Sequence, residues 1–286
     1  MRSKIAFIFL IITTLSGRLI SSEIVLSSMD KAMIQVKLEK FSKDSSLPIG
    51  DLVLKIGLDF LNTPYVAKTL DKSKEEKLVI NLHQLDCTTF AENCLALART
   101  VKSNKSGIET FCSELESIRY RGGKMDGYAS RLHYFSEWIL DNEVRHHVQS
   151  MAAQMGGKLL PINLNYMSTH PQEYPQLIND AATTAQIKAI EEKVSAHQFF
   201  YIPSVQFENI ESQVKEGDIV TLTTSIPGID VSHVGILLKK DGRIYMLHAS
   251  SSIQKVVIST EPFSQYLTKS KKTTGVMIAR PIELSN

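Results

Sequence analysis

The chain has 286 residues, a formal net charge of +2 and 43% hydrophobic residues, a composition typical of a globular protein with one large domain or two small ones. A charge so close to balance, with no dense run of Lys and Arg between aromatic residues, argues against a nucleic-acid-binding surface. No internal apolar stretch is long enough to span a bilayer. We therefore expect no nucleic-acid partner and no stable membrane insertion of the mature protein.

The N-terminus has the layout of a secretory signal peptide. Arg2 and Lys4 precede an apolar run over residues 5–15, and small polar residues follow it. The run is too short for a membrane span, although an uncleaved anchor is an alternative. We expect residues 1–22 to be a signal peptide and residues 23–286 to form a single catalytic domain, periplasmic or secreted and monomeric.

The first half of the mature chain has the spacing of helices. Polar stretches at 68–77 and, with its glycines, at 120–127 indicate loops, and a helix holding Trp138 follows the second one. Residues 145–198 are polar and broken by Gly and Pro, and we interpret them as a helical insertion over the core. The expected helices before that insertion span residues 30–42, 48–62, 87–102 and 107–119.

From residue 199 onward the apolar residues alternate with a period of two, which is typical of strands. A helical turn at 262–269 interrupts them. Helices first and a run of antiparallel strands afterwards indicate an α+β fold. The expected strands span residues 199–203, 217–224, 232–239, 243–249, 254–259 and 275–280.

Cys87 is the first candidate catalytic residue. It follows a polar loop and precedes an apolar helical pattern, so it is expected in the first turn of the helix. Free backbone N–H groups and the positive end of the helix dipole stabilise a thiolate there, and the thiolate is the nucleophilic form. The alternative is that Cys87 is simply a small buried hydrophobe.

The cysteine count also favours a free thiol at position 87. Three cysteines leave at least one unpaired. Cys87 and Cys94 are seven residues apart on one helix, about 10.5 Å, which exceeds the reach of a disulfide. A Cys94–Cys112 disulfide remains open.

Two histidines are expected on one face of a β-hairpin. Asp241-Gly242 is a two-residue hairpin turn, which pairs Lys240 with Arg243. This register makes His233 and His248 diagonal neighbours on one face. The opposite face then presents an apolar set suited to a core: Val234, Ile236, Leu238, Tyr245 and Leu247.

Cys87 and the two histidines together can supply a nucleophile, a base and an orienting group. His233 would take the thiol proton, His248 would hold the ring of His233, and the N–H of Cys87 would help to bind the oxyanion. A catalytic zinc on the same three side chains is the competing arrangement, but no short ligand spacing supports a metal site. We expect no cofactor.

Several motifs, in this order along the chain, resemble NlpC-type cell-wall cysteine hydrolases. They are Asn62-Thr-Pro-Tyr65, Leu85-Asp-Cys-Thr-Thr-Phe90, Ser232-His-Val-Gly-Ile236 and Leu247-His-Ala-Ser250. Residues 85–98, 126–134 and 228–235 resemble more closely the N-acetylmuramoyl-L-alanine amidase-like branch. Thr88-Thr89 replaces the Ser-Gly of the general signature, as in that branch.

The resemblance implies a papain-like core, with the nucleophile helix packed on an antiparallel sheet or half-barrel. It implies a cysteine amidase that hydrolyses the amide between the lactyl group of N-acetylmuramic acid and L-alanine in peptidoglycan fragments. Cys87, His233 and His248 would be catalytic. The residues expected to contact substrate are Tyr65, Asp86, Thr88, Arg131 and Ser232.

Two other functions stay open at this point. A stem-peptide endopeptidase could use the same fold and the same three catalytic residues, and a catalytically silent protein could bind muropeptides in the same pocket. In peptide-cutting relatives the Asp before the Cys binds a free amine, which a muramoyl substrate lacks. The role of Asp86 is therefore open.

Overall fold

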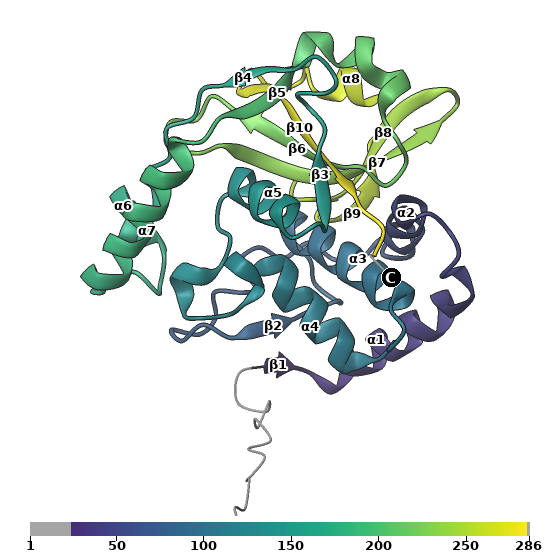
Figure 1. Ribbon diagram of the computed structural model, residues 1–286, viewed down its shortest axis with the longest axis horizontal. Coiled ribbons are helices and arrows are strands. Elements are labelled where there is room, and N and C mark those ends of the chain that lie inside the picture. The colour runs from purple at the N-terminus through teal and green to yellow at the C-terminus, as the bar shows by residue number, and fades with distance from the viewer. Residues whose placement is uncertain (1–23, 285–286) are drawn as a thin grey trace, which may run out of the picture.

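The computed structural model describes residues 24–284 and stacks a helical layer against one curved sheet (Figure 1). The expected signal peptide lies outside the described residues. A separate two-stranded parallel pair joins β1 (Ile24–Leu26) to β2 (Leu78–Ile80) on the far side of the helices. The sequence pattern did not predict this pair, because three-residue strands have too few positions to show alternation.

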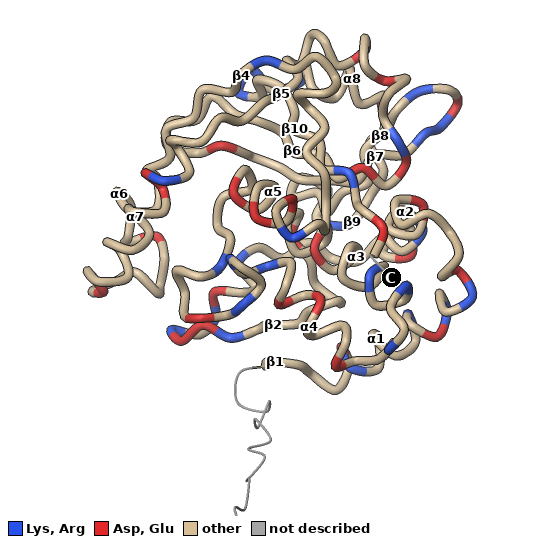
Figure 2. The backbone as a smooth tube through the Cα atoms, viewed as in Figure 1, with Lys and Arg blue, Asp and Glu red and all other residues tan. Residues whose placement is uncertain are grey.

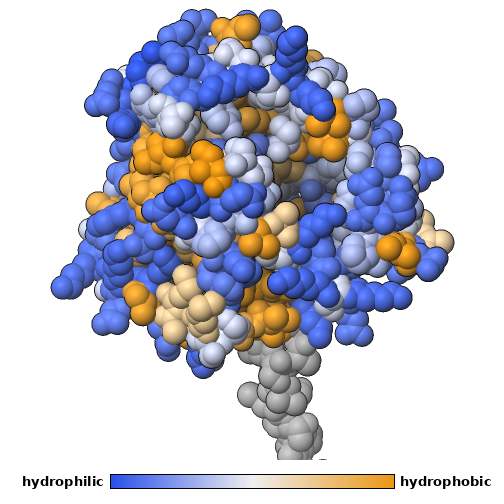
Figure 3. Space-filling view, turned by 180° about the vertical axis from the view of Figure 1, so that it is seen from behind, coloured by the Kyte–Doolittle hydropathy of each residue, from blue (hydrophilic) through white to orange (hydrophobic). Residues whose placement is uncertain are grey.

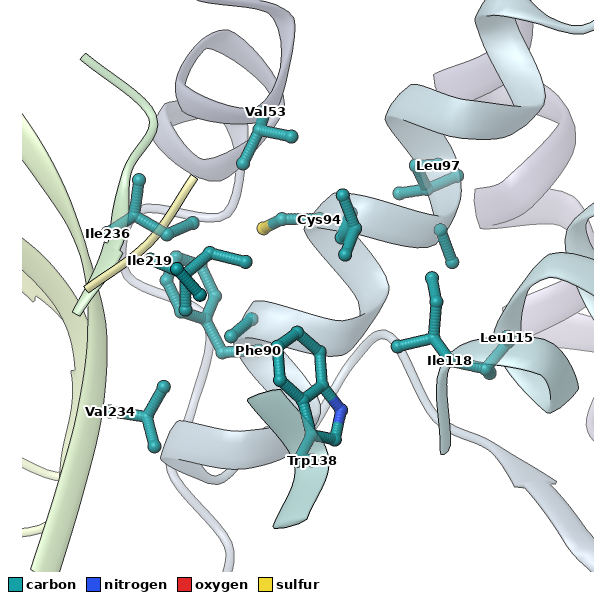
Figure 4. Packing of buried hydrophobic residues seen from close by; sticks show 14 of the residues in the cluster. Val53, Phe90, Cys94, Leu97, Leu115, Ile118, Trp138, Ile219, Val234 and Ile236 are labelled. Carbon is teal, nitrogen blue, oxygen red and sulfur yellow. The ribbon is translucent and has the colours of Figure 1, made fainter. Parts of the chain in front are cut away.

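The helical layer is centred on α3 (Cys87–Lys102), which lies between the sheet and the other helices (Figures 1 and 4). Phe90, Cys94 and Leu97 belong to the apolar helical pattern that follows Cys87, and all three are buried. The opposite face is buried as well, including Thr89 and Asn93. The surrounding helices are α1 (Ser28–Phe41), α2 (Ile49–Asp59), α4 (Ile108–Arg119) and α5 (Phe135–Val144).

The main sheet has eight strands, paired antiparallel, in the order β4-β5-β10-β6-β7-β8-β9, with β3 pairing to β10. The mixed α+β class expected from the sequence is therefore confirmed. The strands predicted in the last third are β5 (Phe199–Pro203), β6 (Ile219–Thr224), β7 (Val231–Lys240), β8 (Arg243–Ser250), β9 (Lys255–Ile258) and β10 (Thr273–Pro281).

Each face of the sheet has its own apolar core. Val234, Ile236 and Leu247 pack towards α3, in the cluster drawn in Figure 4. Leu237 and Met246 point the other way, into a second cluster covered by the 3-10 segment 204–213 and by α8 (Phe263–Tyr266). Alternate residues of β7 and β8 thus serve opposite cores, as a period of two requires.

The segment 145–198 corrects one expectation. It contains α6 (Tyr166–Thr169) and α7 (Ala181–Ser195), but also β3 (Val148–Ser150) and β4 (Lys158–Leu160), which extend the main sheet. It is therefore not a purely helical insertion. Both strands pair through their backbones and lack an alternating apolar pattern, so their sequences gave no strand signal.

All three cysteines are free, so the optional Cys94–Cys112 disulfide does not form. Within residues 24–284 no helix combines the length and apolarity needed to cross a bilayer. Charged residues gather in the helical layer and at the tip of the β7–β8 hairpin, whereas most of the sheet is uncharged (Figure 2). Seen from behind, hydrophobic patches lie between hydrophilic ones on the surface (Figure 3).

Candidate active site

Cys87 is the first residue of α3, as the sequence predicts. Asp86 caps the helix: its side chain accepts a 2.8 Å hydrogen bond from the N–H of Thr89, and Thr89 Oγ1 accepts a 2.9 Å bond from the N–H of Asp86. This reciprocal pair fixes the direction in which the chain enters the helix. It places the Cys87 N–H in the first turn, where no helical carbonyl is available to accept from it.

The β7–β8 hairpin brings the two histidines together. Lys240 pairs with Arg243, and the same register continues to Ile236 and Leu247. The predicted pairing is therefore confirmed over these residues. His233 Nε2 lies 2.6 Å from His248 Nδ1, and the two rings meet edge to face. The nearby register shift lies between β6 and β7, so it leaves the hairpin register intact.

The nitrogens define which tautomer can support catalysis. The Nε2 of His233 is occupied by His248, so Nδ1 is the nitrogen left to accept a proton. If Nδ1 is to be unprotonated, Nε2 carries the hydrogen and donates it to His248 Nδ1. The proton of neutral His248 is then on its own Nε2.

A cavity of about 370 Å³ collects most of the predicted site residues. It is lined by side chains from the start of α3, from β7 and from the loop before α5, together with α6. Of the predicted residues it contains Asp86, Cys87, Thr88, Arg131, Ser232 and His233. His248 does not line this cavity and contacts it through His233.

Cys87 and His233 are half-buried, and His248 is buried. Burial and the charge of Asp86 raise the pKa of the Cys87 thiol to about 12, although hydrogen bonds from the backbones of Val234 and Thr88 oppose the rise. Burial and the neighbouring His248 lower the pKa of His233 to about 3. Burial lowers the pKa of His248 to about 4. Burial thus shifts the pKa of both groups towards their neutral forms, opposite to the effect expected of the helix N-terminus on Cys87.

Tyr65 lies near Cys87 but does not line the cavity. Residues 64–66 run alongside Leu85 through two backbone hydrogen bonds. Burial, with the nearby Cys87 and Asp86, raises the pKa of the Tyr65 phenol to about 12. The hydroxyl therefore stays protonated at neutral pH and remains a hydrogen-bond donor.

Arg131 lines the cavity, but its charge is already paired. Its guanidinium bonds to Asp71, lies 3.7 Å from Glu76 and packs over the ring of Tyr128. Asp86 likewise accepts the helix-capping hydrogen bond from the Thr89 N–H with one carboxylate oxygen. Both residues reach the site where the sequence predicts them, but each also has a structural role there.

The sequence reasoning missed several residues that line the same cavity. Glu92 and Arg119 form a buried ion pair at 2.7 Å. Asp230 accepts a hydrogen bond from the Ser136 N–H at the start of α5, which ties the chain just before His233 to that helix. Glu92 lies five residues after Cys87, among the polar residues of α3. Polar residues on one side of a helix usually face solvent, so the sequence pattern did not indicate that Glu92 is buried.

The histidine geometry does not suit the alternative metal site. The facing nitrogens of His233 and His248 share one proton across 2.6 Å, so neither lone pair of that pair is free for a common ion. Within the described part of the chain, no group of three His, Cys, Asp or Glu side chains has a metal-binding arrangement.

Cys87 and His233 thus line one cavity, and His248 contacts His233 from behind it. Residues 55–276 match the model of the N-acetylmuramoyl-L-alanine amidase-like family. The chain belongs to this family, and it is an amidase.

Solved structures agree with this assignment. An N-acetylmuramoyl-L-alanine amidase from Bacteroides uniformis is 37% identical, with a TM-score of 0.76 over 82% of this chain and 99% of that one. A Bacteroides fragilis protein proposed to be a xylanase is 39% identical, with a TM-score of 0.75 over 79% of this chain and 99% of that one. A Legionella pneumophila protein at 19% identity shares the fold, with a TM-score of 0.68 over 89% of this chain and 95% of that one. Among curated proteins, none matches the chain.

Proposed function

We propose that the protein is a cysteine amidase of the NlpC-type, papain-like superfamily. Its substrate is a muropeptide, and the bond it hydrolyses joins the lactyl group of N-acetylmuramic acid to L-alanine. The observation that carries the proposal is that His233 lines the same cavity as Cys87, the first residue of α3, while its Nε2 lies 2.6 Å from His248 Nδ1. The substrate class follows from the family.

In the acylation step, His233 Nδ1 takes the Cys87 proton as sulfur attacks the carbonyl carbon. His248 accepts the hydrogen bond from His233 Nε2 and shares the positive charge. We assign the N–H of Cys87 and the hydroxyl of Tyr65, whose raised pKa reflects the nearby Cys87, as the donors to the oxyanion. His233 then passes its proton to the amine of L-alanine, the C–N bond breaks, and a muramoyl thioester remains on Cys87.

Water completes the reaction. It attacks the thioester carbon while His233 takes one of its protons, and the C–S bond breaks. The proton returns to the sulfur, which restores the neutral thiol. The products are the free lactyl carboxyl group of muramic acid and the peptide with a free N-terminal amine, so one water is consumed and no proton is gained or lost by the enzyme.

A glycosidase reaction, the activity proposed for the B. fragilis relative, fits this cavity less well. Glycoside hydrolysis needs two carboxyl groups free to act on the glycosidic bond. Here Glu92 is paired with Arg119, Asp86 caps α3, and Asp230 accepts from backbone N–H groups. The carboxylates of the cavity are therefore engaged in structural contacts.

A peptidoglycan substrate implies action outside the cytoplasm. This agrees with the secretory layout expected for residues 1–22, and we infer a periplasmic or secreted enzyme that acts as a monomer on muropeptides.

The test is product identification on a defined muropeptide by mass spectrometry. We expect the wild-type enzyme to release N-acetylmuramic acid and a peptide that begins with L-alanine, and Cys87→Ala to release neither. Cys112→Ala, which alters a buried cysteine outside the site, is the matched control and should retain activity. Cleavage within the peptide would instead establish a stem-peptide endopeptidase, and an inert wild-type enzyme would establish a silent binding protein.

A further inference from the structure

A second cavity, of about 410 Å³, is lined by His248. His233 lines both this space and the first cavity, whereas Cys87 lines only the first. The walls of the second cavity come mainly from the ends of β8 and β9 and from the chain around α8. Besides the two histidines, its lining contains one acidic and one basic side chain, Glu261 and Lys269.

The ring of His248 has one nitrogen without a direct partner. Its Nδ1 accepts the hydrogen bond from His233 Nε2, so the proton of neutral His248 lies on its own Nε2. Among the described residues, no carbonyl or side chain accepts a hydrogen bond from that Nε2. Positive charge that His248 shares with His233 during the reaction therefore depends on the charges that line the second cavity.

Glu261 is an ionised carboxylate in a fixed position. Lys269 Nζ and Thr260 Oγ1 each lie 2.5 Å from one of its oxygens. These two hydrogen bonds lower the pKa of Glu261, so the carboxylate is charged at neutral pH. Ser259 Oγ donates to the Glu261 carbonyl at 2.9 Å and accepts from the Met246 N–H at 3.1 Å. The backbone of this carboxylate is thus fastened to β8, the strand that also positions the histidine.

Other ionisable groups lie around the same ring. Tyr266 on α8 meets it edge to face, with 5.6 Å between ring centroids, and burial raises the pKa of this phenol, which stays neutral. His233 on β7 and Cys87 on α3 have pKa values shifted towards their neutral forms. Burial lowers the pKa of His248 to about 4, and the charge of Glu261 opposes that shift. Glu261 is therefore the group that favours a positive charge on the pair.

We propose that Glu261 is a positioning residue for catalysis, whose carboxylate acts through His248 to stabilise the imidazolium that forms when Cys87 loses its proton. Lys269 offsets part of this effect, because it lies against the same carboxylate. The inference rests on the proposed function and extends it to a residue that does not touch substrate. One proton moves, from the Cys87 sulfur to His233 Nδ1, and Glu261 takes up none.

The two members of the ion pair should act in opposite directions. Glu261→Gln keeps the size of the side chain and removes its charge, so kcat for an N-acetylmuramoyl dipeptide should fall about fivefold with little change in KM. Lys269→Met leaves the carboxylate uncompensated and should raise kcat about twofold. A purely structural ion pair would lower kcat in both variants. Glu208→Gln, which breaks an exposed pair with Arg243 and lines neither cavity, is the control and should leave kcat unchanged.

The pH profile gives a readout that a structural role would not move. The acid limb of kcat/KM reports the pKa of the histidine pair in the free enzyme. Loss of a negative charge disfavours the imidazolium, so Glu261→Gln should shift this limb by about half a pH unit to lower pH. Lys269→Met should shift it to higher pH by a similar amount. Titration of the histidine rings by 15N NMR follows the same pKa without substrate.

Several results would overturn the inference. They are an unchanged kcat and acid limb in Glu261→Gln, a fall of kcat in both variants, or ring pKa values that neither substitution shifts. Lys269 is exposed, so Lys269→Met serves as the test by itself if Glu261→Gln does not fold. If the wild-type enzyme does not cleave the muramoyl amide, the proposed function fails, and the NMR titration alone still decides whether Glu261 acts on the histidine pair.

Discussion

Two groups of ionisable side chains along the first cavity differ in whether each charge has a partner of opposite sign. On one side Arg119 pairs with Glu92, and Arg131 pairs with Asp71. On the other, Cys87 and His233 have no counter-charge, and burial moves the pKa of each towards its neutral form. Burial thus retains a charge only where a partner compensates for the lost water.

This contrast assigns different roles to the two regions. The paired charges hold α3 to α4 and shape the cavity, and they exist before substrate arrives. In the proposed mechanism the thiolate of Cys87 and the imidazolium of His233 form together, when substrate is bound and its carbonyl is attacked.

The largest effect on stability should follow from breaking the buried Glu92–Arg119 ion pair. Glu92→Met leaves Arg119 buried without a partner, which should lower the free energy of unfolding by about 3–5 kcal/mol. The double variant Glu92→Met/Arg119→Met should recover most of this loss, because no unpaired charge remains. Urea denaturation measures both. Glu192→Met, in the exposed pair with Lys188, is the control and should cost less than about 1 kcal/mol.

Changes around Cys87 and His233 should affect catalytic activity more than stability. His248→Phe removes the acceptor for His233 Nε2–H, so kcat should fall about 100-fold, equivalent to about 2.7 kcal/mol, with little change in KM. His248→Asn can still accept that hydrogen bond and should recover part of the rate. A Phe variant as active as the wild type would show that His248 does not position His233.

Alkylation of the resting enzyme distinguishes a neutral pair from a preformed ion pair. With the pKa of Cys87 near 12 and that of His233 near 3, the thiolate fraction rises with pH across the neutral range. Modification of Cys87 by iodoacetamide, followed by peptide mass spectrometry, should accelerate about tenfold per pH unit between pH 6 and pH 9. A rate that is flat across this range would mean that the thiolate already exists at rest.

The smallest effect concerns the helix cap. Asp86→Ala should lower the free energy of unfolding by about 1 kcal/mol, because the Thr89 N–H loses its acceptor. Asp86→Asn keeps an acceptor and should retain most of the stability. Both variants remove a negative charge next to the sulfur, so both should make Cys87 alkylate faster. Equal stability of all three proteins would show that the cap contributes little.

The sequence predicted most of this arrangement where the signals are local. The Asp241-Gly242 turn and the alternation of β7 and β8 were sufficient to place His233 beside His248. The polar loop before an apolar helix was sufficient to place Cys87 at the start of α3.

Features that depend on contacts between distant segments could not be predicted in this way. Glu92 meets Arg119, and Asp230 meets Ser136, only after the helices have packed. The same holds for β3 and β4, which are strands because β10 and β5 offer them backbone partners. Burial raises the pKa of Cys87, and local spacing does not report burial.

The central claim is that Cys87 carries the muramoyl group as a thioester during turnover. Acid quenching of the enzyme with a muropeptide, followed by mass spectrometry of the peptide that contains Cys87, tests it most directly. We predict an adduct with the mass of the N-acetylmuramoyl acyl group and no amino acid attached. An adduct that includes L-alanine, or an unmodified Cys87 under rapid turnover, would contradict the account.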